Sequence, residues 1–293
     1  MNNLEEAHYH EQIINFLENL SQDTGDVINA EYCKRQLERL TQPPSLRNRI
    51  FYVIFNLKEQ EITWSRFVHQ TLGFQDINLE KPSKNQITFR KYLGTIKPNY
   101  LPIYTAFGSC AYRLAKQQPQ VRAELHKMNM QCMMQLPIRL KDGKYYWTTQ
   151  VGIPFEVDSN NNLVSNINVY EIGLEYNGQK MLKPMILLKD GKERRTDLEK
   201  MLQQQLSEDF FEEFLGFKAK VVQLIKKYNE ENPLNIETVA DDLKTPIETI
   251  KAYNKLIKQR VNQYFSEDIN PFPDAKSAAR YLGRLLGDYL VLK

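Results

Sequence analysis

Two stretches in the middle of the chain place apolar side chains at nearly every second position. The first runs from Cys132 to Leu140 and the second from Tyr145 to Val157. Between them lies Asp142-Gly143, a residue pair that tight hairpin turns favour. Because successive side chains of a strand point to opposite faces, the alternation predicts two antiparallel strands, each with a buried face.

The same kind of pattern extends on both sides of this hairpin. A polar turn at Asp158–Asn162 leads into a third strand, and Asn177-Gly178 predicts a further hairpin into Met181–Leu188. Within the third strand the apolar parity changes between Val169 and Ile172, which predicts a bulge near Tyr170-Glu171. An apolar helical pattern from Asn99 to Lys116 precedes the strands. The sequence therefore predicts a curved antiparallel sheet with helices packed on its inner face.

Short motifs in this region resemble those of PAS sensor domains. They are Leu72-Gly73-Phe74, Ile96-Lys97-Pro98, Leu140–Trp147 and Pro154–Asp158. The resemblance spans about residues 62–188 and implies a pocket that holds a small ligand, a flavin, a haem or nothing. The histidines are scattered, and Cys110 lacks the neighbours of a light-sensing flavin site. No residue demands a cofactor, so its identity stays unknown, and the Met-rich stretch around Cys132 predicts ordinary core packing.

A second constraining pattern lies near the C-terminus, where a short helix and a longer, basic helix are predicted on either side of a tight turn. Apolar residues recur every three or four positions before the turn and again after it; they are Ile236, Val239, Ala240, Leu243, Ile247, Ile250, Leu256 and Ile257. Thr245 as N-cap, Pro246 at the first helical position and Glu248 three residues after the cap predict a capping box. Lys244 would hold a left-handed conformation in this turn at some cost.

This region, about Phe217 to Val261, resembles the DNA-binding domain of LuxR-type transcription regulators. The resemblance is carried by Val239–Leu243, the three-residue turn, and Glu248–Lys255. The chain departs from the family pattern at Lys244, at the shifted Thr245-Pro246 and at Tyr253. What the resemblance implies is that the second helix lies in the major groove of double-stranded DNA. The residues it places at the DNA are Lys244, Thr245, Thr249, Lys251, Ala252, Asn254, Lys255 and Lys258.

The distribution of charge agrees with a phosphate-binding C-terminal region. From Phe217 to the end there are 13 Lys and Arg residues against 10 Asp and Glu, whereas acidic and basic residues balance in the rest of the chain. All of the net charge of +3 therefore falls in the predicted DNA-binding region, although a solvated helix face can give a similar count.

These patterns predict an α+β chain: a PAS-like antiparallel sheet with helices, followed by an all-α helix-turn-helix domain. We expect an N-terminal helical element over residues 1–61, which includes a third helix over Leu46–Leu57 and serves as a cap or a dimerisation element. A PAS-like sensory domain follows over 62–195 and a connector helix over 196–216. The helix-turn-helix domain with a C-terminal helix then covers 217–293.

Several classes of protein are not expected. The chain contains no nucleotide-binding glycine loop and no Gly-x-Ser-x-Gly or His-Glu-x-x-His motif, so no catalytic residue is predicted and an enzyme is not expected. Its three cysteines lie far apart, which predicts neither disulfides nor a metal site. The polar N-terminus does not resemble a signal peptide, and no apolar run is long enough to span a bilayer. A cytoplasmic protein without a membrane association is expected.

The most consistent expectation is a sequence-specific transcription regulator that binds double-stranded DNA as a homodimer, with a PAS-like domain that senses a signal or mediates dimerisation. A small-molecule ligand of that domain is left open. Two alternatives also stay open. The C-terminal helices could be a protein-interaction module on a dimeric PAS-like platform, or the chain could be a small-molecule-binding protein with a vestigial helix-turn-helix.

Overall fold

The computed structural model describes residues 26–40, 49–77, 86–117, 130–160, 162–177, 186–189, 193–194, 196–230, 235–265 and 271–286. These residues divide into two compact units, one ending at Glu199 and the other beginning at Lys200. Residues 1–25 of the expected N-terminal helical element and Gly178 of the expected hairpin turn lie outside the described residues.

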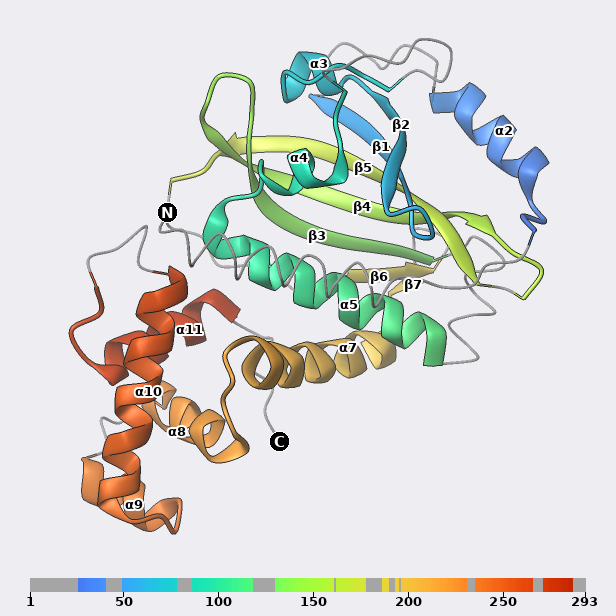
Figure 1. The fold of residues 1–293 in the computed structure, drawn as a ribbon. Helices are drawn as coiled ribbons and strands as arrows, with labels where there is room; N and C mark the ends of the chain where they lie inside the picture. Colours follow the sequence, from blue (N-terminus) through green and yellow to red (C-terminus); the bar gives the residue numbers. More distant parts are fainter. Residues whose placement is uncertain are drawn as a thin grey trace. The chain divides into compact units, whose positions relative to one another are not determined.

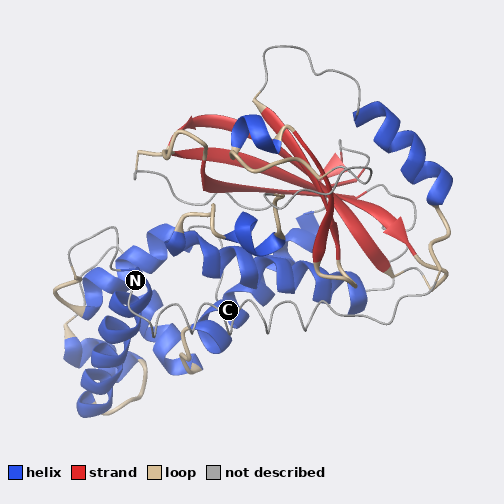
Figure 2. Cartoon of the chain, turned by 45° about the horizontal axis from the view of Figure 1, so that its top comes forward, coloured by secondary structure: helices blue, strands red, loops and turns tan. Residues whose placement is uncertain are grey.

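The first unit is built on a seven-stranded antiparallel sheet in the order β2-β1-β5-β4-β3-β6-β7 (Figure 1). Figure 2 shows the strands as one twisted sheet. The strands are β1 (Ile50–Asn56), β2 (Glu61–Arg66), β3 (Met130–Arg139), β4 (Tyr145–Val157), β5 (Leu163–Glu175), β6 (Ile186–Lys189) and β7 (Glu193–Arg194). The predicted β3–β4 hairpin is confirmed, because Arg139 pairs with Tyr145 across the turn at Asp142-Gly143.

Helices cover both faces of this sheet. They are α2 (Ala30–Leu40), α3 (Val68–Thr71), α4 (Phe89–Leu93), the 3-10 turn η1 (Pro98–Tyr100) and α5 (Leu101–Gln117). On one face, Cys33 of α2 packs with Ile54 of β1 and with Ile167 of β5. On the other face, Phe55 of β1 stacks on Phe89 of α4 with ring centres 4.2 Å apart.

The prediction of a helix over Leu46–Leu57 is wrong. Residues 50–56 form β1, which lies inside the sheet between β2 and β5, so the predicted N-terminal helical element of residues 1–61 does not continue to its expected end. The error has a physical cause. Phe51 stacks on Tyr170 at 4.3 Å, and Ile54, which points the opposite way, contacts the α2 side. A strand that is buried on both faces is apolar at consecutive positions, so its period of two is lost.

The bulge expected at Tyr170-Glu171 is absent from those positions, and the burial of β5 on both faces explains this second error. The β4–β5 register is continuous from Thr148↔Ile172 to Pro154↔Asn166 and shifts only beyond these pairs, next to Trp147 and next to Glu156. The change of apolar parity in β5 arises because Ile167 packs under α2 whereas Tyr170 packs on the opposite face.

The second unit is helical throughout its described part. Its elements are α7 (Thr196–Asp209), which begins just before the unit boundary, the π-helical turn η2 (Phe210–Phe214), α8 (Ala219–Asn229), α9 (Ile236–Asp242), α10 (Ile247–Phe265) and α11 (Ala275–Leu286). Aromatic contacts join η2 to the end of α10: Phe214 lies 4.6 Å from Tyr264, and Phe210 lies 6.4 Å from Phe265.

With an antiparallel sheet and helices in the first unit and helices in the second, the α+β class and the PAS-like antiparallel sheet are as predicted. Among the described residues, no helix is both long and apolar enough to cross a membrane.

Candidate nucleic-acid interface

The turn between α9 and α10 is tight and closed by backbone hydrogen bonds. Thr245 N donates to Ala240 O at 2.9 Å, and Lys244 N donates to Asp241 O at 3.1 Å. Lys244 has φ 48°, the left-handed conformation expected of it. A residue with a side chain adopts this conformation at some cost in free energy, and the surrounding contacts must supply it.

The predicted capping box at the start of α10 is not formed. The helix begins at Ile247, and Thr245 Oγ1 donates to Leu243 O at 2.9 Å. The carboxylate of Glu248 accepts from Lys251 Nζ at 2.7 Å, so it is turned along the helix and away from Thr245. Thr245 is buried, and its hydroxyl stabilises the turn.

Lys220 of α8 holds this turn from outside. Its ammonium group donates to Leu243 O at 3.0 Å, to Lys244 O at 3.3 Å and to Thr245 Oγ1 at 3.0 Å. A cation at the C-terminal end of α9 also interacts favourably with the helix dipole. Sequence reasoning did not single out Lys220, and no local pattern identifies it, because its partners lie 23 to 25 residues away.

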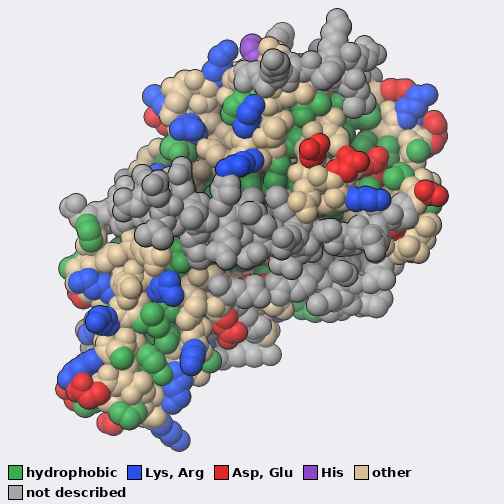
Figure 3. Space-filling view, in the orientation of Figure 1, with side chains coloured by type: hydrophobic (Ala, Val, Ile, Leu, Met, Phe, Trp, Pro, Cys, Tyr) green, Lys and Arg blue, Asp and Glu red, His purple; other side chains and the backbone are tan. Residues whose placement is uncertain are grey.

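The exposed face of α10 carries four of the predicted DNA-binding residues: Lys251, Ala252, Lys255 and Lys258. The three lysines are spaced four and three residues apart and therefore lie on one side of the helix. Lys251 is paired with Glu248, whereas Lys255 and Lys258 have no hydrogen bond or ion pair with any residue that the structure describes. Figure 3 shows that on the visible face of the helical unit Lys and Arg side chains are more widespread than Asp and Glu.

The opposite face of α10 is buried and fixes its orientation. Its contacts to the other helices are made by Ile250, Ile257, Val261, Tyr264 and Phe265. Thr249, also predicted at the DNA, is half-buried on the flank of the helix. Because the buried face is continuous, the lysine-bearing face must point outward.

Asn254, another predicted DNA-binding residue, is turned toward α8. Its Oδ1 accepts from the Tyr228 hydroxyl at 2.7 Å, and Tyr228 is buried. Burial raises the pKa of Tyr228, which keeps the hydroxyl a donor at neutral pH, while the bond to Asn254 lowers that pKa in part. The described contact of Asn254 is therefore structural, and it leaves the side-chain NH₂ group without a partner among the residues that the structure describes.

The C-terminal helix α11 supports α8. Asn229 Nδ2 donates to Ile225 O within α8 at 2.8 Å and to Ala279 O of α11 at 3.0 Å. Arg280 Nε donates to Tyr228 O at 3.3 Å, at the C-terminal end of α8. A Cβ atom on Gly283 would lie 2.0 Å from Asn229 Oδ1, so a larger residue here would displace the Asn229 side chain. The predicted final helix is thus present and packs behind the helix that carries Tyr228.

The sheet unit holds a buried polar cluster of another kind. Gln150 Nε2 of β4 donates to Asn168 Oδ1 of β5 at 3.0 Å, and Asn166 Nδ2 donates to the same oxygen at 2.9 Å. The Tyr92 hydroxyl of α4 reaches Gln150 Oε1 at 3.4 Å. Burial raises the pKa of Tyr104 to about 12 and that of Tyr92 well above its usual value, so both phenols stay protonated. Among the described residues no group of His, Cys, Asp and Glu side chains could hold a metal ion.

No family model and no curated protein matches the chain. Several solved structures of VqmA proteins overlap with it at low identity. A phage VqmA–DPO complex is 8% identical, with 90% of this chain and 93% of that chain covered at a TM-score of 0.27. A Vibrio cholera VqmA–ligand–DNA complex is 11% identical, with 87% and 89% covered at a TM-score of 0.23. A Vibrio cholerae VqmA dimer, whose description refers to LuxR-type receptors, is 11% identical, with 88% and 92% covered at 0.24. Likeness of this degree carries no argument about function.

Proposed function

We propose that the chain is a sequence-specific, DNA-binding transcription regulator of the helix-turn-helix kind. The observation that carries the proposal is the outward face of α10. It presents Lys255 and Lys258, which have no partner among the described residues, next to the small side chain of Ala252. A helix with a buried apolar side and an exposed basic side, held after a tight turn, can enter the major groove.

In this proposal the residues of α10 divide into two roles. Lys255 lies in the middle of the exposed face, and its ammonium can donate to guanine O6 and N7. Lys258, one turn further on, neutralises phosphate. Ala252 lets the helix approach the base edges closely. Lys244 and Thr245 bring the turn near the sugar-phosphate backbone, and the free NH₂ of Asn254 and the hydroxyl of Thr249 are donors at the two flanks.

Binding of this type depends on how rigidly α10 is held. Lys220 fixes the turn before the helix, and Tyr228 fixes its middle through Asn254. Neither residue needs to touch DNA to influence affinity, because a displaced helix loses contacts along its whole length.

Replacing Lys255 tests the proposal on a duplex that the protein selects. Lys255→Ala should weaken binding to that duplex by about 1–3 kcal/mol and relax the preference at one base position if Lys255 reads a base. Lys258→Ala should weaken binding to all sequences alike and lower the slope of log K against log[salt] by about one. Lys34→Ala, which removes an exposed lysine from α2 in the sheet unit, is the matched control. Unchanged affinity and sequence preference in Lys255→Ala would remove this residue from the interface.

A sensory role for the PAS-like unit is favoured by the cluster of Tyr92, Gln150 and Asn168. Buried amide groups cost free energy unless they are hydrogen-bonded, and an apolar core would avoid that cost. Polar groups gathered on one inner face give the unit the means to recognise a small hydrogen-bonding molecule. Gln150→Leu should leave the sheet folded and abolish any rise in melting temperature that such a molecule causes in the wild type.

We also propose that the regulator acts as a homodimer on a two-fold DNA site, with α7 as a candidate contact. Met201 on this helix is an exposed large apolar residue. Sedimentation of the free protein and of Met201→Glu tests this arrangement. A monomer that still selects a two-fold site would show that DNA alone brings the two copies together.

A further inference from the structure

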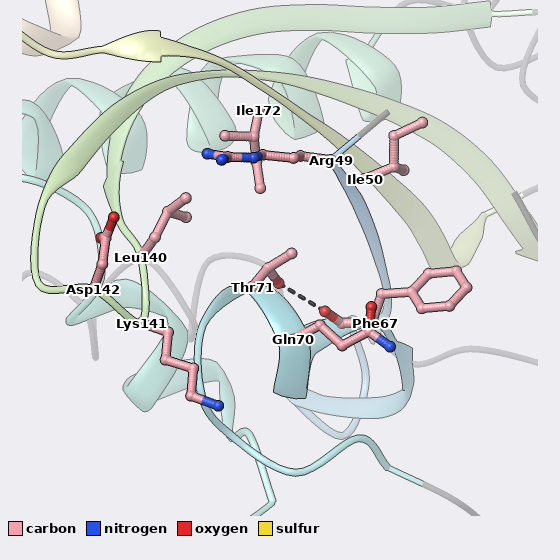
Figure 4. Close-up of a pocket in the computed structure, with 9 residues that line it drawn as sticks. All are labelled: Arg49, Ile50, Phe67, Gln70, Thr71, Leu140, Lys141, Asp142 and Ile172. Carbon is pink, nitrogen blue, oxygen red and sulfur yellow. Dashed lines mark hydrogen bonds between the residues drawn. The ribbon is translucent and has the colours of Figure 1, made fainter. Parts of the chain in front are cut away.

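A pocket on the sheet unit shares no lining residue with the buried polar cluster of Tyr92, Gln150 and Asn168. It has a volume of about 520 Å³ and is formed where the start of β1, the helix α3, the β3–β4 turn and the end of β5 meet (Figure 4). Pockets that bind small molecules commonly have volumes of about 300–1,000 Å³. Its size is therefore sufficient for a small metabolite.

The pocket has an apolar floor. Leu140 before the β3–β4 turn and Ile172 of β5 are largely buried, and Ile50 and Phe67 complete this surface. Phe67 has φ 63°, a left-handed conformation that an aromatic residue rarely adopts. Arg66 lies over its ring at 4.6 Å, which helps to hold the ring in place. Strained residues of this kind are often found where a ligand is held.

A positively charged side chain, Arg49, and a negatively charged one, Asp142, lie at the rim of the pocket. Figure 4 shows Arg49 extending past Ile172 on the side where Leu140 and Asp142 lie, whereas the ammonium of Lys141 points away. Tyr146 links the two charged groups: its hydroxyl donates to Asp142 Oδ2 at 2.7 Å, and Arg49 Cζ lies 5.9 Å from the centre of its ring. Nevertheless, among the described residues no ion pair joins Arg49 to Asp142.

Hydrogen bonds hold the backbone of Arg49 and the turn that carries Asp142, and both charged groups have hydrogen-bonding capacity left. The Arg49 carbonyl accepts from Ile172 N at 2.9 Å, which anchors its backbone to β5. Asp142 Oδ1 accepts from Lys144 N at 3.0 Å, and Lys141 N donates to Thr71 O at 2.8 Å, which ties the turn to α3. A carboxylate has about four acceptor sites and a guanidinium five donors, so each can take a further partner.

We propose that this pocket binds a free α-amino acid with an apolar side chain. The guanidinium of Arg49 would bind the carboxylate of the ligand, and Asp142 would accept from its ammonium group. Its side chain would lie on the floor formed by Leu140 and Ile172. An amino acid carries a carboxylate, an ammonium group and an apolar side chain on one carbon, and an anion or a cation alone would leave one rim charge unmatched. The proposal is independent of DNA binding.

The test uses the full chain and three probes that share one carbon skeleton. L-leucine carries both charges, 4-methylpentanoate lacks the ammonium group, and 3-methylbutylamine lacks the carboxylate. The expected result is that leucine raises the melting temperature in a concentration-dependent way, by mass action, and that neither analogue does so at equal concentration. L-phenylalanine extends the test to a larger apolar side chain.

Variants then place the binding in this pocket. Arg49→Met and Asp142→Asn should each weaken leucine binding, measured by titration calorimetry, by about tenfold to a hundredfold. Asp142→Asn keeps an acceptor for Lys144 N, so the turn stays intact. Arg35→Met on α2 is the matched control and should bind as the wild type does. The proposal is overturned if neither amino acid shifts the melting temperature at about 10 mM, well above an ordinary ligand's dissociation constant. It is also overturned if the analogues bind as well as leucine, or if Arg49→Met binds unchanged.

Discussion

Replacing Gly283 with alanine tests how α11 supports the helical unit. An alanine Cβ would lie 2.0 Å from Oδ1 and 2.5 Å from Cγ of Asn229, closer than van der Waals contact allows. The Asn229 side chain must therefore rotate away and release its bonds to Ile225 O and Ala279 O. Two partly exposed hydrogen bonds contribute about 2 kcal/mol together, whereas alanine in place of glycine inside a helix stabilises by about 1 kcal/mol. Gly283→Ala should therefore lower the free energy of unfolding by about 1 kcal/mol.

The same substitution should have the opposite sign when Asn229 is absent. Asn229→Ala alone should cost about 2 kcal/mol, because both hydrogen bonds are lost. In that background the clash disappears, so Gly283→Ala should stabilise by about 1 kcal/mol, which gives a coupling energy of about 2 kcal/mol between the two positions.

Urea denaturation of the four proteins, followed by far-UV circular dichroism, measures this cycle. The chain has two tryptophans, Trp64 and Trp147, and both lie in the sheet unit, so their fluorescence reports on that unit separately. The fluorescence transition should stay in place in all four proteins. If Gly283→Ala is destabilising by the same amount with and without Asn229, the proposed clash does not exist.

Three further predictions concern single residues. Tyr228→Phe removes the donor to Asn254 and should lower the free energy of unfolding of the helical unit by about 1 kcal/mol; an unchanged urea midpoint would mean that this bond contributes nothing. Lys220→Met keeps the apolar stem but loses the three hydrogen bonds of the ammonium group at the turn, so specific DNA affinity should fall several-fold. An unchanged affinity for the selected duplex would contradict the positioning role of Lys220. Burial, together with the charge of Glu156, raises the pKa of Cys33 from its usual value of 9.0 to about 11. The unfolded chain therefore ionises first, and the free energy of unfolding should fall as the pH rises from 9 to about 11. Cys33→Ala should reduce that fall, and an identical pH profile would exclude Cys33 as its source.

The sequence predicted those parts of the fold whose pattern is local. The β3–β4 hairpin follows from alternation around Asp142-Gly143. A C-terminal helix was expected as well, and the structure has α11 with the Asp274 side chain accepting from Ser277 N at 2.8 Å, as an N-cap does. By contrast, β1 was predicted as a helix. Its residues contact α2 on one face and α4 on the other, and these helices come from distant parts of the chain.

The candidate site, too, could be predicted from the sequence only where the pattern is local. The basic face of α10 could be predicted, because the spacing of Lys251, Lys255 and Lys258 is a local property of one helix. The contacts that orient this helix could not. Lys220 and Tyr228 lie on α8, and their roles arise only when the turn after α9 and the middle of α10 pack against it. The capping box failed for the same reason, since the Thr245 hydroxyl is engaged by Leu243 and Lys220.

The most direct test of the central proposal has two steps. Duplexes that the protein binds are selected from a random DNA pool, and the affinity for the selected sequence is then measured as a function of salt concentration. A two-fold-symmetric site with a steep negative slope of log K against log[salt] is the predicted result, and that slope should become shallower by about one in Lys258→Ala, which removes a phosphate contact. If no sequence is enriched even at low salt, the free protein does not read DNA. The exposed face of α10 would then belong to a contact with another protein.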